Sequence, residues 1–117
     1  MFPKPNRLPS EAFTRVFRTG KRIHGEIFGV IAAPNSQPLS RFAVWVGVKI
    51  DKRATKRNRM KRLVREAVRH LLPTIKPGFD CIIIAKKNFS EKKGGVEHSL
   101  QELLTRLNLS NNVTMKQ

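Results

Sequence analysis

Cysteine is almost absent from the sequence, whose 117 residues include only Cys81. A lone cysteine has no partner in the chain for a disulfide, which excludes a disulfide-stapled scaffold and fits a reducing compartment. Cys81 lies within the apolar run FDCIIIA. In that setting a small buried core residue is the favoured interpretation over a reactive nucleophile.

Long hydrophobic runs are absent as well. No apolar stretch approaches the roughly 20 residues that a membrane-spanning helix needs. The opening stretch MFPKPNRLPSEAF also lacks the apolar centre of a secretory signal. We therefore expect a cytoplasmic protein with no membrane partner.

Acidic residues are scarce compared with basic ones. The chain has 24 lysines and arginines but only 8 aspartates and glutamates, which gives a net charge of +16. So much charge of one sign is costly in self-repulsion unless an anionic partner relieves it, and nucleic acid is the leading candidate.

Signatures of catalysis are missing too. The three histidines are scattered, the acids are dispersed, and the sequence has no HxxxH or CxxC spacing and no glycine-rich phosphate loop. We expect no catalytic side chain and no metal bound by the protein alone.

The length suits a single domain over residues 1–117. Residues 1–9 contain three prolines and are predicted to form an extended arm. Ser10 is the predicted N-cap of a helix over residues 10–19. Alternating apolar side chains, with Ile23, Ile27 and Ile31 on one face, predict a strand over residues 23–33.

Four more segments complete the predicted fold. A second strand over residues 42–48 is expected to pair with the first as an antiparallel hairpin with a long loop. A helix from about 54 to 72 ends at Pro73, and residues 76–87 contain a continuous apolar strand typical of the centre of a sheet. A last helix spans about 96–109, and residues 110–117 are predicted to be a frayed tail. The order αββαβα indicates an α+β sandwich of helices on one sheet.

The predicted helix over residues 54–72 has an apolar face and a basic face. At about 100° per residue, the apolar face carries Met60, Leu63, Val64, Ala67, Val68 and Leu71. The opposite face carries Asn58, Arg62, Arg65 and Arg69, with Arg59 and Lys61 on its flanks.

Further cations precede the first apolar residue of this helix. Arg53, Lys56 and Arg57 should surround its first turn, beyond the edge of the sheet. Cations there gain nothing from the helix dipole, which favours anions at this end, so their placement indicates a bound phosphate.

A solvated basic face is the ordinary explanation of a charge cluster. Solvated helices usually mix charges of both signs, however, whereas here like charges follow one another at Arg62, Arg65 and Arg69, with only Glu66 near them. Because the planar guanidinium of arginine can pair with two phosphate oxygens, the pattern favours binding to a folded polyanion.

Phe13 and Phe17 lie one turn apart on the first predicted helix. Core packing is the favoured interpretation of each residue taken alone. The alternative is that one of them lies at the edge of a groove and stacks on unpaired bases.

Three segments resemble the bacterial ribonuclease P protein family. RNRMKRLVRE at 57–66 matches its signature R-N-R-x-K-R-x-x-R, and this match is specific. RLPSEAFTRVFRTGKR at 7–22 resembles the opening of that family, and GFDCIIIAKK at 78–87 resembles the strand after its basic helix. With the last helix, these segments cover nearly the whole chain in family order.

The resemblance implies a small basic partner of a catalytic RNA that removes the 5′ leader of precursor tRNA. Hydrolysis would then depend on Mg²⁺ held mainly by the RNA. It further implies a βαβ unit with a left-handed crossover, against the usual right-handed rule. The leader would enter a cleft between the first helix and the sheet, at Phe13 and Phe17. The predicted RNA-binding residues are Lys49, Arg53, Lys56, Arg57, Asn58, Arg59, Lys61, Arg62, Arg65 and Arg69.

The sequence departs from the family pattern at two places. GVKIDKRAT lacks one lysine of the usual Lys-Lys pair and the glycine that follows the second long strand. An aromatic of the sheet face in some members falls at Ile31, and the chain has no tyrosine. Phe28 is the predicted substitute in the leader cleft.

Two other functions fit part of the pattern. A structural RNA-binding protein, such as a ribosomal component, would show the same charge and the same lack of catalytic groups. A DNA-binding basic helix is less favoured, because the sequence has neither the second helix of a helix-turn-helix nor the heptads of a zipper. DNA is therefore not an expected partner.

Overall fold

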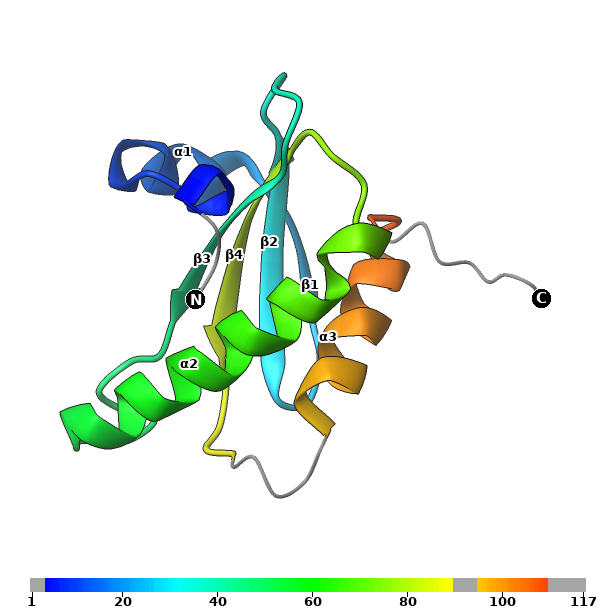
Figure 1. Cartoon of the computed structure of the whole chain (residues 1–117). Helices are drawn as coiled ribbons and strands as arrows, with labels where there is room; N and C mark the ends of the chain where they lie inside the picture. Colours follow the sequence, from blue (N-terminus) through cyan, green and yellow to red (C-terminus); the bar gives the residue numbers. More distant parts are fainter. Residues whose placement is uncertain (1–3, 90–94, 110–117) are drawn as a thin grey trace.

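The computed structural model describes residues 4–89 and 95–109, so the predicted tail at 110–117 lies outside the described residues. Helices pack on a mixed four-stranded sheet, which confirms the predicted α+β class (Figure 1). The elements in chain order are η1 (Lys4–Asn6), α1 (Ser10–Thr19), β1 (Lys21–His24), β2 (Phe28–Pro34), β3 (Arg41–Trp45), α2 (Ala54–Leu71), η2 (Leu72–Thr74), β4 (Phe79–Ala85) and α3 (Gly95–Arg106).

Strand β4 lies inside the sheet, whose order is β1-β2-β4-β3. It pairs antiparallel with β2 and parallel with β3. Cys81, Ile82 and Ile83 are fully buried, as expected for a strand covered on both faces. The predictions of a central apolar strand and of a buried Cys81 are confirmed, and burial also raises the pKa of the Cys81 thiol.

The predicted hairpin between residues 23–33 and 42–48 is wrong. Strand β4 lies between β2 and β3, so these two strands do not pair with each other. The real hairpin is more local: the predicted strand over residues 23–33 is divided between β1 and β2, which pair antiparallel with each other. The Gly25 N–H donates to the Phe28 carbonyl at 2.8 Å and closes the turn between them.

This turn changes which residues share a face of the sheet. Ile23 pairs with Val30, and both contribute to the core under α2 and α3. Ile31 faces the other way, toward α1. The predicted common face of Ile23, Ile27 and Ile31 is therefore wrong at Ile31, because the turn interrupts the period of two that a continuous strand would keep.

Helices cover both faces of the sheet. Helices α2 and α3 pack on one face, over a core that includes Val30, Ala32, Val64, Ile83 and Leu100. Helix α1 packs on the opposite face, where Val16 contacts a smaller cluster of Ile31, Ala33 and Ile82. Alternate residues of β2 and β4 thus supply the two cores, as strand geometry requires.

The connection from β3 through α2 to β4 is left-handed. In Figure 1 both strands run down the page, α2 crosses in front of the sheet, and β4 lies to the right of β3. When the view is turned so that both strands point upward, with α2 still in front of the sheet, β4 lies to the left of β3. The chain therefore moves to the left from β3 to β4, whereas nearly all such crossovers move to the right. The handedness implied by the family resemblance is present.

The ends of α1 and α2 lie close to the predicted residues, and the differences are at the start of α1 and in the N-terminal arm. Helix α1 spans the predicted residues 10–19, but Pro9 is the N-cap residue, and Ser10 lies inside the helix. The N-terminal arm is not simply extended, because it contains the turn η1 and then runs beside β3, where the Leu8 N–H donates to the Phe42 carbonyl. Helix α2 ends at Leu71, just before Pro73, as expected.

Candidate nucleic-acid interface

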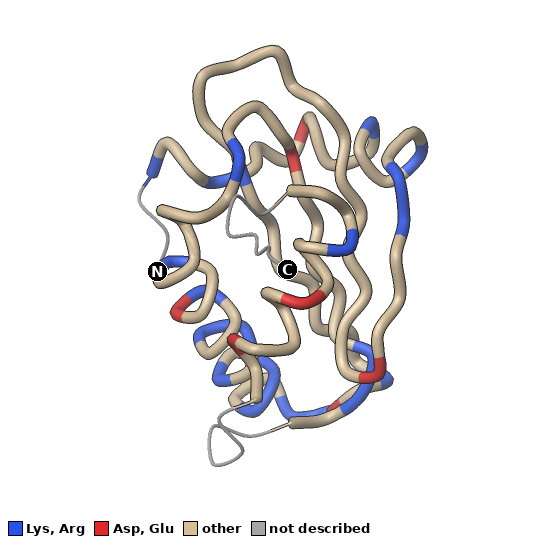
Figure 2. The backbone as a smooth tube through the Cα atoms, turned by 90° about the vertical axis from the view of Figure 1, so that its right-hand side faces the viewer, with Lys and Arg blue, Asp and Glu red and all other residues tan. Residues whose placement is uncertain are grey.

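Helix α2 has the predicted apolar and basic faces. Its buried residues are Met60, Val64, Ala67, Val68 and Leu71, while Leu63 is half-buried. The tube in Figure 2 shows lysine and arginine recurring along the successive turns of this helix. One side of α2 is therefore fixed to the sheet, and its cations point away from the core.

The predicted basic residues of α2 differ in accessibility. Arg65 and Lys61 are half-buried, because they lie beside the packed face. Lys49, in the loop before α2, is by contrast exposed. Of the predicted residues on the helix itself, those that are exposed are Lys56, Asn58, Arg59, Arg62 and Arg69.

Arg53 and Arg57 have partners within the protein. The Arg53 backbone N–H and Nε donate to Asp51 Oδ1 at 2.9 and 3.0 Å, and its Nη2 donates to Oδ2 at 2.9 Å. Arg57 Nη1 donates to the carbonyls of Asp51 and Lys52 at 3.0 and 2.9 Å. Both arginines thus hold the loop that leads into α2, and Arg53 still exposes 68% of its side chain.

Asp51 organises the loop before α2, because it accepts hydrogen bonds from Arg53 and Asn88. Hydrogen bonds from the Arg53 side chain and backbone hold the pKa of Asp51 well below its usual value. Asn88 adds a fourth donor, at 3.0 Å from Asp51 Oδ2, and so connects the loop to the segment that follows β4. The entry to α2 is therefore fixed by hydrogen bonds.

Arg69 is less available to an anionic ligand than its exposure suggests. Its Nη2 lies 2.6 Å from Glu66 Oε2, three residues earlier on the same helix. This pairing occurs at the end of α2 that is remote from Lys56. Of the predicted stripe, Arg69 is thus the member that is tied to an acid of α2 itself, whereas Arg62 is exposed nearer the middle of the helix.

Three aromatic rings meet between α1 and β3, and we call Phe13, Phe17 and Trp45 the aromatic surface. The Phe13 and Phe17 rings are stacked at a centroid distance of 6.2 Å. Trp45 contacts both rings, at 5.9 Å from Phe13 and 6.2 Å from Phe17. The guanidinium of Arg22, on β1, lies 4.7 Å from the Phe17 ring centre, a cation–π contact.

The two phenylalanines have different surroundings. Phe13 is half-buried and packs against the cluster under α1, whereas Phe17 is 37% exposed. This difference agrees with the two interpretations that the sequence left open: Phe13 contributes to the core, and Phe17 presents its ring to solvent.

Trp45 was missed by the sequence reasoning. Its signal is the period of two along β3, since Phe42, Val44 and Val46 were assigned to the core and Trp45 must then face the side that α1 covers. The predicted substitute, Phe28, is wrong as a cleft residue. Its side chain is fully buried in the core under α2 and α3, where it contacts Phe89.

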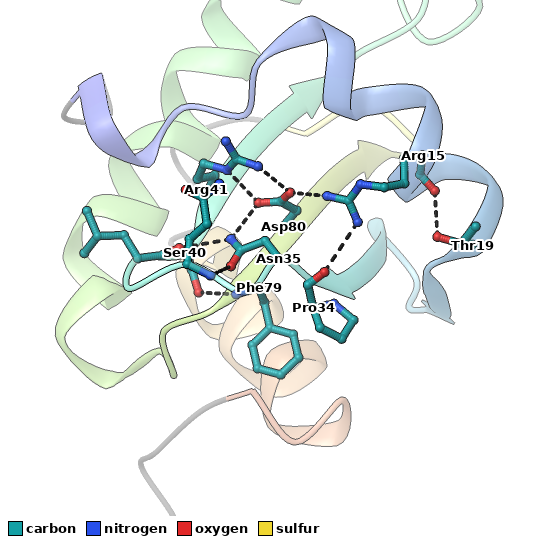
Figure 3. Close-up of polar contacts among 10 residues, drawn as sticks. Arg15, Thr19, Pro34, Asn35, Ser40, Arg41, Phe79 and Asp80 are labelled. Atoms are coloured by element: carbon teal, nitrogen blue, oxygen red, sulfur yellow. Dashed lines mark hydrogen bonds and ion pairs between the residues drawn. The ribbon is translucent and has the colours of Figure 1, made fainter.

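A buried carboxylate fixes α1 to the sheet beside the aromatic surface (Figure 3). Asp80, on β4, has no exposed side-chain area. It accepts hydrogen bonds from Arg41 on β3, from Asn35 after β2, and from Arg15 Nη2 on α1, the last at 2.6 Å. Three separate segments therefore converge on this one side chain.

The charge of Asp80 is stabilised by these neighbours. Burial by itself would raise the pKa of Asp80, but hydrogen bonds from Arg41 and Asn35 and the charges of Arg41 and Arg15 outweigh it. The pKa of Asp80 consequently lies below its usual value. The same contacts also raise the pKa of Arg41.

Gly20 allows α1 to approach the sheet closely where the helix ends. A Cβ at this position would lie 2.6 Å from Ile31 Cγ2 and 2.7 Å from the Val16 carbonyl oxygen. Any side chain there would push α1 away from β2. Gly20 and Asp80 thus both set the position of α1, and with it the position of Phe17.

Two further observations concern all the residues that the structure describes. Within residues 4–89 and 95–109, no three side chains of His, Cys, Asp or Glu come close enough together to hold a metal ion. None of the helices in this part of the chain is long and apolar enough to cross a membrane.

Comparisons with known proteins identify relatives along nearly the whole sequence. A family model described as Ribonuclease P matches residues 2–108. The ribonuclease P protein component of Microcystis aeruginosa is 39% identical over 106 residues, which cover 86% of this chain and 87% of the relative. The corresponding protein of Picosynechococcus sp. is 35% identical over 102 residues, or 86% of each chain.

Solved structures agree with the sequence matches. The RNase P protein from Thermotoga maritima, in complex with 1-(4-fluorophenyl)-2-thiourea, is 33% identical, with a TM-score of 0.70 over 92% of this chain and 100% of that one. A mutant RNase P protein of Staphylococcus aureus is 25% identical, with a TM-score of 0.78 over 91% of both chains. The specific signature at residues 57–66 and these matches together favour one family over a generic RNA-binding protein.

Proposed function

Because this chain belongs to the ribonuclease P protein family and is a subunit of that endoribonuclease, we propose that it binds the catalytic RNA through α2 and the 5′ leader of precursor tRNA through the aromatic surface. The proposal distinguishes two kinds of RNA contact. Helix α2 offers cations for phosphates, and the aromatic surface offers ring faces for unpaired bases.

The observation that carries this proposal is that one small domain presents a basic helix on one face of its sheet and exposed aromatic rings on the other. Helix α2 presents Arg62 and its neighbours away from the core, and those charges suit the backbone of a folded RNA. Phe17 lies on the opposite face of the sheet, where α1 packs. The bases of a single-stranded leader are unpaired, so each of them could stack on an exposed ring whatever its sequence.

In this proposal the chemistry belongs to the RNA. Mg²⁺ held mainly by the catalytic RNA would activate water for hydrolysis of the phosphodiester bond, leaving a 5′ phosphate on the mature tRNA. The protein would supply binding energy to the substrate and positive charge to the RNA. Its cations would replace part of the screening that the RNA otherwise takes from metal ions.

The direct test compares precursor and mature tRNA as ligands of the holoenzyme. The proposal predicts tighter binding of the precursor, because only the precursor carries a leader that can reach the aromatic surface. Removing the leader from the same tRNA provides the matched control. Equal affinities for the two tRNAs would contradict a leader-binding role.

A further inference from the structure

Trp45 is 45% exposed, although it carries the largest apolar side chain in the sequence. It lies at the end of β3, which is an edge strand of the sheet. An aromatic ring contributes most to stability or binding when it is buried, and an exposed apolar surface often marks a binding site. Phe17, which contacts Trp45, is 37% exposed, so the open area is shared by two adjacent rings.

The indole is held in place before any ligand arrives. Phe13 meets it edge to face, with a 63° angle between the ring planes, and Phe17 meets it at 52°. Phe13 is itself packed on the core cluster under α1. Because the ring is already ordered, a ligand that stacks on it pays little of the usual entropy cost of fixing a side chain.

The position of Trp45 connects the aromatic surface with the loop before α2. The indole Nε1 lies on the side of Gly47, where a Cβ would be 3.9 Å away. The chain then continues through the exposed Lys49 and Lys52 to the first turn of α2. A strand of RNA that leaves Phe17 across the edge of the sheet would therefore pass Trp45 before it reaches these cations.

We propose that Trp45 stacks on one unpaired nucleobase of the precursor-tRNA leader and extends the aromatic surface to the sheet edge. The chain would then contact one more leader nucleotide than Phe13 and Phe17 alone could hold. This inference rests on the proposed function. It goes further by assigning a stacking role to Trp45, which lies beside Ile84 of β4 on the edge strand β3.

A second copy of this chain is a less suitable occupant of the same surface. Two molecules that each carry a net charge of +16 repel one another. Arg22, whose guanidinium lies over the Phe17 ring, would add to that repulsion. RNA brings bases for the rings and phosphates for the lysines of the loop, so its charge is complementary.

Intrinsic fluorescence can test the contact directly, because Trp45 is the only tryptophan and the chain has no tyrosine. The probe is a single-stranded octaadenylate, and its matched control is an abasic oligonucleotide of the same length and charge. Stacking predicts that the octaadenylate quenches the indole emission and that the abasic strand binds without comparable quenching. Equal effects of the two strands would overturn the proposal.

The second test uses the holoenzyme and tRNA precursors with leaders of increasing length. Trp45→Ala should lower the affinity for long-leader precursor roughly 5- to 150-fold, which corresponds to the 1–3 kcal/mol measured for base–aromatic stacking. The loss should first appear at one particular leader length. Binding of mature tRNA should not change, and Trp45→Phe should retain most of the preference because it keeps a ring.

The outcomes separate this inference from the function on which it rests. If wild-type holoenzyme prefers precursor tRNA and Trp45→Ala keeps the full preference at every leader length, only the role of Trp45 is overturned. If wild-type holoenzyme binds both tRNAs equally, the leader function itself is overturned, and the inference with it. Dimers of RNA-free protein that Trp45→Ala abolishes would assign the surface to self-association instead.

Discussion

Arg41 and Asp80 lie opposite each other on the parallel strands β3 and β4, and the Arg41 guanidinium donates from Nε and Nη2 to the two carboxylate oxygens, each at 2.8 Å. Arg15 approaches the same carboxylate from α1. This arrangement ties the helix that carries Phe13 and Phe17 to the two strands beneath it. The aromatic surface is thus positioned by an ion-pair network as well as by apolar packing.

Replacing Asp80 with asparagine should destabilise the fold. The substitution leaves the arginines without their counter-charge, and we expect a loss of about 3 kcal/mol, the low end for a broken buried pair because Arg15 and Arg41 stay partly exposed. Chemical denaturation measures the change. Glu66→Gln is the control, since it removes an ion pair at the surface and should have a much smaller effect.

The contribution of Asp80 should depend on pH. Because its pKa is lowered in the folded state, the carboxylate stabilises the fold above the unfolded pKa of about 3.9, and this stabilisation is lost as the pH falls through the folded value. Wild type and Asp80→Asn should therefore differ clearly at pH 7 and converge in strongly acidic solution. A difference in denaturation midpoint that is the same at both pH values would contradict this account.

Much of the fold follows from local sequence patterns, and the exceptions depend on distant partners. The period of 3.6 located α1 and α2, and Pro73 marked the end of α2 because it cannot continue a helix. The pairing of β2 with β4 was not predictable from periodicity, since the alternation in a strand says which face is buried but not which strand lies beside it. The short turn after Gly25 was hidden in an otherwise regular apolar alternation.

The basic stripe should reveal itself through the salt dependence of RNA binding. Arg62→Ala and Arg65→Ala should each weaken binding to the catalytic RNA and lower the slope of log K against log salt by about 0.7–0.9 per lost phosphate contact. The control is Arg106→Ala, which removes an exposed cation from α3 instead. A double variant of Arg62 and Arg65 with an unchanged slope and normal circular dichroism would indicate a merely solvated face.

Phe17 and Phe28 should respond in opposite ways to truncation. Phe28 is fully buried, so Phe28→Ala should cost about 3–5 kcal/mol of stability. Phe17→Ala should reduce stability far less but weaken the binding of precursor tRNA by about 1–3 kcal/mol, with mature tRNA unaffected. Thermal melts and tRNA affinities of both variants decide the matter. A large drop in melting temperature for Phe17→Ala with an unchanged affinity ratio would place Phe17 in the core.

The candidate site was predictable where it rests on one helix and less so where it is assembled from several elements. The stripe through Arg62 follows from α2 alone, because helical spacing fixes which residues share a face. The aromatic surface combines α1 with β3, so the proximity of Phe17 and Trp45 depends on how the two elements pack. The roles of Arg57 and Asp51 in holding the loop were hidden for the same reason: their contacts are set by the loop conformation.

The most direct test of the whole account is reconstituted cleavage of precursor tRNA at low Mg²⁺, with and without this protein. We predict that the protein alone is inactive, that a bacterial ribonuclease P RNA alone cleaves poorly, and that the two together release the 5′ leader efficiently, because the protein's cations replace part of the metal screening. Cleavage by purified protein free of RNA, or no gain when the protein is added to the RNA, would contradict the account.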